Sequence, residues 1–209
     1  MATRQISFTT ALKEALAEEM AADSRVILLG EDVATYGGVY KVSQGLLERF
    51  GPDRVRDTPI SEAVIVGAGV GAAIQGLRPV VEIMYADFIP IALDQIVNQA
   101  SLLYFVSGGT VNVPLVIRTQ GGSGSYAGPQ HSKSLEAWFG HIPGLKVVAP
   151  STPAEAKGLL KAAIRDDNPV VIFEDKMLYQ SKGPVPTEEY VLPLGVADIK
   201  RTGEDITIV

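Results

Sequence analysis

Short apolar runs recur along this chain, and longer amphipathic or polar segments separate them. A short run with few polar interruptions is typical of a strand that is buried on both faces of a parallel sheet. Parallel neighbours need crossover connections of about a dozen residues or more, which the separating segments can supply. The expected strands are 25–30, 80–84, 113–118, 145–149 and 170–173. We therefore expect an α/β fold, a doubly wound and mostly parallel sheet with helices on both faces.

Helices are expected before and between these strands, at residues 8–22, 43–50, 61–75, 87–106 and 153–166. The first of them carries its apolar residues at helical spacing, and Ser7 or Thr9 is its candidate cap. Ser151 or Thr152 is expected to cap the last. Pro90 falls in the first turn of the fourth expected helix, where proline is tolerated.

The chain changes character after the last expected strand. Three prolines punctuate the segment that follows, and a new apolar run begins at its far end. We expect an α/β domain over residues 1–183, a linker over 184–203, and the start of a truncated C-terminal domain at 204–209.

Composition excludes several classes of function. The net charge of −6, with no cluster of lysine or arginine, argues against nucleic acid or an anionic membrane as the main partner. The chain has no cysteine, which excludes thiolate catalysis, disulfides and cysteine-ligated metals and permits a reducing compartment. The longest nearly uncharged apolar run, 63–74, is too short to span a bilayer, and no secretory signal is visible. We expect a cytoplasmic protein.

The stretch 58–73 places one carboxylate, Glu62, at the start of an apolar, glycine-rich segment. Residues 67–72 fit a loose G-x-G-x-x-A pattern, and Glu82 follows near the end of the next strand, as in a dinucleotide-binding fingerprint. The alternative is a helix whose small face, Gly67 with Gly71, lets a neighbouring helix approach closely. On that interpretation the helix dipole alone explains Glu62 if the side chain is exposed, whereas a buried Glu62 needs a partner.

His131 and His141 are the two histidines of the chain. No cysteine or third ligand accompanies them, so the sequence does not favour a metal pair. His131 follows the glycine- and serine-rich segment 121–128, which suits either a catalytic loop or a solvated one. That segment lacks the lysine and the serine or threonine that end a phosphate-binding P-loop.

A set of motifs occurs in one order along the chain: Gly30-Glu-Asp-Val33, Arg56-Asp-Thr-Pro-Ile-Ser-Glu62, Asp94-Gln-Ile-Val-Asn98, Gln130-His-Ser132 and Pro143-Gly-Leu-Lys-Val-Val148. Together they resemble the β subunit of thiamin-diphosphate-dependent 2-oxo acid dehydrogenases, the E1 component, including the pyruvate and acetoin types. The resemblance covers essentially the whole chain and implies a transketolase-like, pyrimidine-binding domain.

The resemblance implies roles for particular residues. Glu62 matches the glutamate that hydrogen-bonds N1′ of the aminopyrimidine and so favours the tautomer that deprotonates the thiazolium. Phe88 matches the aromatic residue that stacks on the pyrimidine, and Ile60 lies beside the cofactor. His131 matches the histidine that handles protons during decarboxylation or acyl transfer to lipoamide. The residues that match a potassium site are Val113, Leu115, Ala163, Asp166 and Asn168.

The chain contains no Gly-Asp-Gly sequence, the motif that holds diphosphate and Mg²⁺ in this family. The resemblance therefore implies half of an active site, which is active only with an α subunit in an α2β2 assembly on a lipoyl-bearing acyltransferase (E2) core. The implied reaction is oxidative decarboxylation of a 2-oxo acid, pyruvate first, with branched-chain acids and acetoin left open. Two alternatives stand beside it: a non-catalytic interaction fragment of such a subunit, and a nicotinamide- or flavin-binding oxidoreductase.

Overall fold

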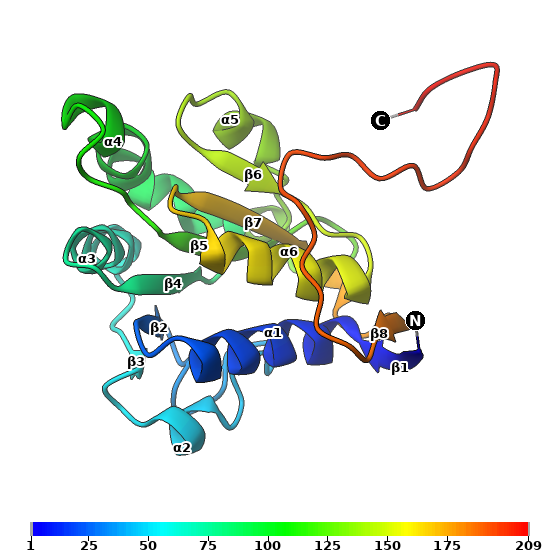
Figure 1. The fold of residues 1–209 in the computed structure, drawn as a ribbon, viewed down its shortest axis with the longest axis horizontal. Helices are drawn as coiled ribbons and strands as arrows, with labels where there is room; N and C mark the ends of the chain where they lie inside the picture. Colours follow the sequence, from blue (N-terminus) through cyan, green and yellow to red (C-terminus); the bar gives the residue numbers. More distant parts are fainter. Residues whose placement is uncertain (1, 209) are drawn as a thin grey trace.

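A central parallel sheet organises the computed structural model, which describes residues 2–208 (Figure 1). Within these residues six strands are hydrogen-bonded in the order β3-β2-β4-β5-β7-β6. Their bounds are β2 Val26–Gly30, β3 Val55–Asp57, β4 Arg78–Ile83, β5 Val116–Gly121, β6 Lys146–Val148 and β7 Val170–Asp175. Every pair in this sheet is parallel. The predicted doubly wound α/β fold is confirmed.

The helices begin largely where the sequence predicts. The α-helices are α1 Phe8–Ala22, α2 Leu46–Phe50, α3 Glu62–Ile74, α4 Leu103–Val106, α5 Glu136–Gly140 and α6 Pro153–Arg165. Ser7 caps α1, because its Oγ accepts the backbone N–H of Thr10 at 3.1 Å. Thr152 caps α6 in a capping box, in which Oγ1 accepts the N–H of Glu155 and the Glu155 carboxylate accepts the N–H of Thr152.

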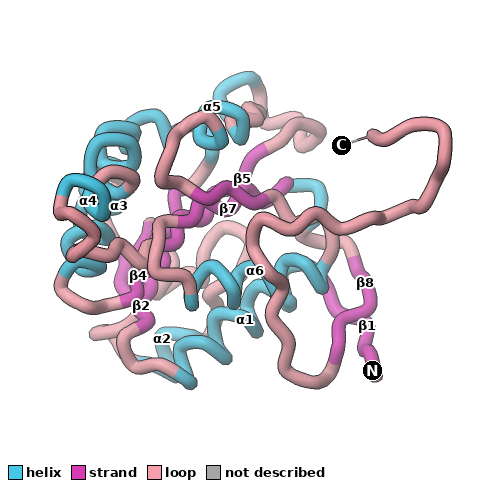
Figure 2. Tube along the Cα trace, turned by 45° about the horizontal axis from the view of Figure 1, so that its top comes forward, coloured by secondary structure: helices cyan, strands magenta, loops and turns pink. Residues whose placement is uncertain are grey.

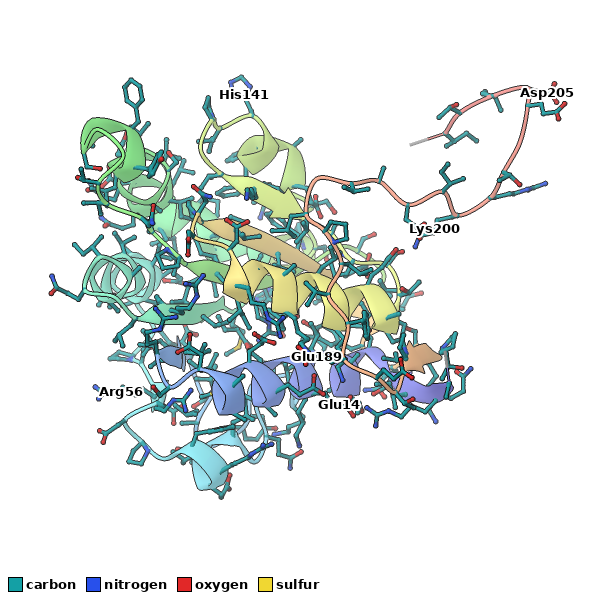
Figure 3. All side chains as sticks on the ribbon, in the orientation of Figure 1. Glu14, Arg56, His141, Glu189, Lys200 and Asp205 are labelled. Carbon is teal, nitrogen blue, oxygen red and sulfur yellow. The ribbon has the colours of Figure 1, made fainter. Side chains whose placement is uncertain are left out.

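Helices cover both faces of the sheet, and each face has its own apolar core. Helices α1 and α6 pack side by side on one face, as both views show (Figures 1 and 2). Helix α3 and the segments that follow β4 cover the other face. Lys157 of α6 also donates to Glu14 and Glu18 of α1 at 3.0 and 2.6 Å. Glu14, labelled in Figure 3, lies along this helix pair.

An antiparallel ribbon outside the main sheet joins the two ends of the domain. Strand β1 (Thr3–Ser7) pairs with β8 (Lys182–Pro186), and Ile6 lies opposite Gly183. The ribbon therefore includes residues 184–186, which we expected to be linker. Residues 187–208 form neither helix nor strand, including 204–208, where we expected the first strand of a further domain; Val209 lies outside the described residues.

The predicted helix over residues 87–106 is wrong as a single element. The chain there forms a 3₁₀ segment η1 (Ala86–Ala92), a π segment η2 (Gln95–Ala100) and the short α4. Pro90 lies inside η1, where it has no N–H to donate and its ring crowds the preceding turn. The two parts, 86–92 and 95–106, meet at 63°. Within residues 2–208 no single helix is long and apolar enough to cross a membrane, and only this bent pair, taken together, passes by length and composition.

Helix α3 packs closely at Gly69 and at Gly67, one of the two glycines of the predicted small face, and not at Gly71. A Cβ atom added at Gly69 would lie 2.9 Å from side-chain atoms of both Leu115 and Val81, so the helix rests directly on the sheet. A Cβ added at Gly67 would meet the Gln95 side chain at 3.2 Å, and one at Gly71 would meet nothing within 4 Å.

Alanine at these two glycines should have opposite effects. Gly69→Ala is expected to lower the free energy of unfolding by about 1–3 kcal/mol, because the new methyl group overpacks a rigid contact. Gly71→Ala should raise it by up to about 1 kcal/mol through better helix propensity. Urea denaturation of the two variants measures both changes, and equal effects would contradict the packing described above.

Candidate active site

The candidate catalytic residues follow strands whose carboxyl ends lie on one edge of the sheet. From β2 the chain goes outward to β3 and then crosses to β4 on the other side of β2, which makes a topological switch point between β2 and β4. Ligands of open α/β sheets bind at this kind of crevice. Glu31 follows β2, Glu62 begins the helix after β3, Phe88 lies after β4, and His131 lies in the loop after β5.

Glu62 is buried although it stands at the start of a helix. It is the first residue of α3, and the residue is only 6% exposed. Among the hydrogen bonds and ion pairs within residues 2–208, none includes the Glu62 side chain, and the N-cap residue Ser61 also makes no side-chain capping bond. The helix dipole favours a carboxylate in the first turn by about 0.3–1 kcal/mol, which does not offset such burial. The explanation from the dipole alone therefore fails, and Glu62 needs a partner from outside this part of the chain.

Other polar atoms beside Glu62 also lack partners. Oε1 of Glu31 and Oγ1 of Thr58 are buried, and neither has a hydrogen-bond partner within the described part of the chain. Burial raises the pKa of Glu31, and the nearby carboxylates of Glu62, Asp32 and Glu82 raise it further. An unpaired buried polar group costs about 1–3 kcal/mol, so this set suits a ligand that brings both donors and acceptors. The aminopyrimidine of thiamin diphosphate is such a ligand.

His131 lies in a cluster of aromatic rings. It belongs to the 3₁₀ turn η3 (Pro129–His131). Its imidazole meets Tyr85 and Phe88 edge to face, with ring centroids 5.0 and 5.4 Å away. Phe88 is carried by η1, which packs against α3, the helix of Glu62. The structure thus gathers the predicted residues Glu62, Phe88 and His131 at one edge, and their roles stay predictions.

Ile60 lies at the rim of this site. It is 81% exposed in the loop before α3, and no packed core includes it. Val64 on α3 and Ile91 on η1 are also exposed. Three exposed apolar side chains therefore lie on or just before the elements that carry Glu62 and Phe88.

The candidate potassium ligands lie at the opposite, amino-terminal edge of the sheet. Leu115 precedes β5 and its carbonyl accepts the N–H of Val170 at 2.9 Å, while the Ala163 carbonyl accepts the N–H of Asp166 at 3.3 Å. The Asp166 carboxylate accepts the N–H of Asn168 at 2.9 Å and lies 2.5 Å from Nζ of Lys146.

These bonds leave capacity for a cation. Each carbonyl oxygen accepts one bond and keeps a second lone pair. Val113, the other candidate, borders a cavity of about 370 Å³ together with Asn168. Lys146 and Arg78 already bind the carboxylate and the backbone carbonyl of Asp166, and the role of the five residues as potassium ligands stays a prediction.

A buried ion network underlies the site and was missed from the sequence. Arg118 donates to Glu174 at 2.7 and 2.8 Å and to Glu82 at 2.8 Å, and all three side chains are buried. Gln120 donates to Glu82, and the Tyr179 hydroxyl donates to Glu174. Burial raises the pKa of Glu82; burial alone would lower that of Arg118, yet the two carboxylates raise it above its ordinary value.

The structure excludes the dinucleotide-binding fingerprint that residues 67–72 suggested. Residues 67–72 lie inside α3, whereas the fingerprint requires a turn between a strand and a helix. Glu82 is bound to Arg118 and Gln120 in the interior, and it cannot reach a ribose from there.

The chain matches the family model described as transketolase, pyrimidine binding domain, over residues 4–182. The chain belongs to this family. It is 50% identical to the 2-oxoisovalerate dehydrogenase subunit beta of Bacillus subtilis, over 98% of this chain and 63% of that protein. It is 52% identical to the pyruvate dehydrogenase E1 component subunit beta of Rhizobium meliloti, over 95% of this chain and 44% of that protein.

A solved structure supports the fold of this pyrimidine-binding domain. A chain described as split gene transketolase, inactive beta4 tetramer, matches with a TM-score of 0.66 at 20% identity, over 82% of this chain and 52% of that chain. The chain spans between 44% and 63% of the length of the two relatives above. The resemblance inferred from the motifs is confirmed at the level of the family.

Several residues beside the site escaped the sequence reasoning. Tyr85 and Asp87 come just after β4, and Lys176 comes directly after β7. The available signal was position, because polar and aromatic residues just after a buried parallel strand reach the edge where ligands bind.

Proposed function

We propose that this chain is the β subunit of the E1 component of a 2-oxo acid dehydrogenase, acting with thiamin diphosphate. The reaction is oxidative decarboxylation of a 2-oxo acid with transfer of the acyl group to lipoamide. The observation that carries the proposal is Glu62, a buried residue whose carboxylate takes part in no hydrogen bond or ion pair within residues 2–208. The names of relatives about half identical to this chain support the same activity.

Three side chains of this chain have roles in the proposed reaction. When bound, the cofactor would supply a nucleophilic carbon and an electron sink for decarboxylation. Glu62 accepts a hydrogen bond from the pyrimidine nitrogen and holds the proton there. Phe88 offers a flat apolar face to the ring. His131, partly exposed at the loop, can exchange a proton with the reacting groups or with solvent.

An α subunit supplies the other half of the site in this proposal. The sequence has no Gly-Asp-Gly motif, and residues 2–208 contain no cluster of three acidic or histidine side chains able to hold a metal. We therefore assign the diphosphate and Mg²⁺ to the α subunit, in an α2β2 assembly that docks on a lipoyl-bearing E2 core. The exposed apolar side chains Ile60, Val64 and Ile91 beside Glu62 suit such a contact.

Pyruvate is the substrate that we propose first. The relatives include proteins named for pyruvate and for 2-oxoisovalerate, at 52% and 50% identity. The comparison of kcat/KM for pyruvate and for branched-chain 2-oxo acids in the assembled enzyme decides between them. We propose a reducing, cytoplasmic location, in line with the absence of cysteine from the sequence.

The melting temperature of the isolated chain should respond differently to its two proposed ligands, potassium and thiamin diphosphate. All five candidate potassium ligands belong to this chain, so KCl should raise the melting temperature relative to equal NaCl. A ligand at ten times its Kd adds roughly 1.4 kcal/mol, or about 3–6 °C for a domain of this size. Thiamin diphosphate with Mg²⁺ should produce less than about 1 °C, because half of its site is missing.

The melting experiment can refute the two ligand proposals separately. A shift with thiamin diphosphate as large as the shift with potassium would refute the half-site. Equal melting in KCl and NaCl would remove the potassium proposal and leave the half-site intact. Addition of the α subunit should then produce the missing cofactor response.

A further inference from the structure

One buried carboxylate joins the segment of Phe88 to the turn of His131. Asp87 precedes Phe88 in η1, and its side chain is 1% exposed. Its Oδ1 accepts the backbone N–H of Ser132 at 3.2 Å and lies 3.0 Å from Nζ of Lys133, while Oδ2 lies 3.5 Å from the Lys133 N–H. A charged acceptor makes these bonds stronger than neutral ones.

A buried lysine holds the other side of the same peptide. Nζ of Lys176, in the turn after β7, donates to the backbone carbonyl of His131. Lys176 is buried, and its ammonium lies 5.6 Å from the ring centroid of Tyr85. The peptide between His131 and Ser132 is therefore held at its carbonyl by a cation and at its N–H by an anion.

The loop needs such an anchor because its own sequence does not fix it. Gly122, Gly124 and Gly128 all have positive φ, and residues 123–130 are exposed. Glycine loses the most conformational freedom when it is ordered, so a free loop would carry the imidazole through many positions. The bonds from Asp87 and Lys176 to the His131–Ser132 peptide, which we call the clamp, instead keep the imidazole edge-on to Tyr85 and Phe88.

We propose that Asp87 is a positioning residue, which sets the place of the His131 imidazole against Phe88. The inference rests on the proposed function, in which His131 handles protons at the cofactor. The part of Asp87 that matters is its bond to the Ser132 N–H. The Lys133 ammonium acts less directly, since its side chain is 49% exposed and its hydrogen bonds go to Asp87 and to the Pro129 carbonyl, not to the His131–Ser132 peptide.

Kinetics of the assembled enzyme test the clamp. Asp87→Ala should lower kcat about 10- to 100-fold with little change in KM, because a catalytic group displaced by about 1 Å loses up to 10²-fold. Asp87→Asn keeps an acceptor oxygen for the Ser132 N–H and should remain within about 3-fold of the unmodified enzyme. Lys133→Met, which removes the ammonium from Asp87 and from the Pro129 carbonyl but keeps the Ser132 bond, is the comparison variant and should lower kcat much less than Asp87→Ala. An Asp87→Asn variant as slow as Asp87→Ala would contradict the role of the backbone bond.

A double-mutant cycle separates positioning from a general structural role. In a His131→Ala background, Asp87→Ala should cause no further loss of kcat, since Asp87 acts through His131. A further loss as large as in the unmodified enzyme would overturn the proposal. If Asp87→Ala does not fold, Lys176→Met frees the same peptide from its other side and enters the cycle in its place.

Histidine NMR gives a readout that does not depend on activity. The chain has two histidines, and His141, at the exposed end of α5, is the internal reference (Figure 3). Asp87→Ala should move the ring signals of His131, which feel the ring currents of Tyr85 and Phe88, and leave those of His141 in place. Unchanged His131 signals would refute the clamp. An inactive unmodified assembly, by contrast, would count against the proposed function alone.

Discussion

Glu62→Gln is expected to lower kcat of the assembled enzyme by about 10²- to 10⁴-fold, the range that a positioned acid or base contributes. Glutamine has nearly the same shape as glutamate and can still accept a hydrogen bond, but it carries no charge to hold a proton on the pyrimidine nitrogen. The measurement is 2-oxo acid decarboxylation with the α subunit, thiamin diphosphate and Mg²⁺ at saturation.

The same substitution should leave the isolated chain at least as stable as before. The residue is buried at 6% exposure and its side chain forms no hydrogen bond or ion pair within residues 2–208, so neutralising it reduces a desolvation cost. Glu48→Gln is the matched control, because Glu48 is an exposed carboxylate in the first turn of α2. A Glu62→Gln enzyme with full activity, or a chain that loses several kcal/mol, would end the assignment of Glu62 to the cofactor.

Arg118→Met is expected to lower the free energy of unfolding by about 3–5 kcal/mol, the largest effect on stability that we foresee. Methionine fills part of the volume, yet it leaves the carboxylates of Glu82 and Glu174 buried without their cation. Urea denaturation at neutral pH measures the loss. Arg25→Met is the control, since the Arg25 pair with Asp23 lies on the surface and should change the stability little.

The loss in Arg118→Met should shrink as the pH falls. Burial raises the pKa of Glu82 even with Arg118 present, so its native form prefers the proton more than its unfolded form does. Stability from such a group is present below the unfolded pKa and is lost as the pH rises through the folded pKa. The variant should therefore be less impaired at pH 5 than at pH 8. An equal loss at both values would show that packing, and not charge, accounts for it.

Local chemistry made parts of this molecule predictable. Ser7 and Thr152 stand just before helical periodicity, and each caps its helix as its side-chain oxygen allows. Apolar runs in the sequence predicted the buried strands. Strand β3 was missed because its three residues include an arginine and an aspartate on an edge of the sheet. Pro90 was expected in the first turn of an α-helix, whereas it lies inside a 3₁₀ segment and the bend follows two residues later.

The parts of the site that could not be predicted depend on register between distant strands. Glu82 lies opposite Arg118 only because β4 and β5 pair as they do, and no spacing along the chain reveals that neighbour. Asp87 accepts the N–H of Ser132, and this contact could not be predicted because the glycines before Ser132 allow the loop many backbone paths. Glu62 could be found through the motif that surrounds it, whereas its burial depends on how α3 rests on the sheet.

The β1–β8 ribbon has a consequence for how the molecule is made. Its strands come from the beginning and the end of the domain, and the N–H groups of Phe8 and Thr9 bond to Ser181 and Tyr179 just beside it. During synthesis the first strand has no partner until the last has left the ribosome. Contacts so distant along the chain slow folding. The N-terminal strand therefore stays unpaired until residues 182–186 have been synthesised, and the domain can close only then.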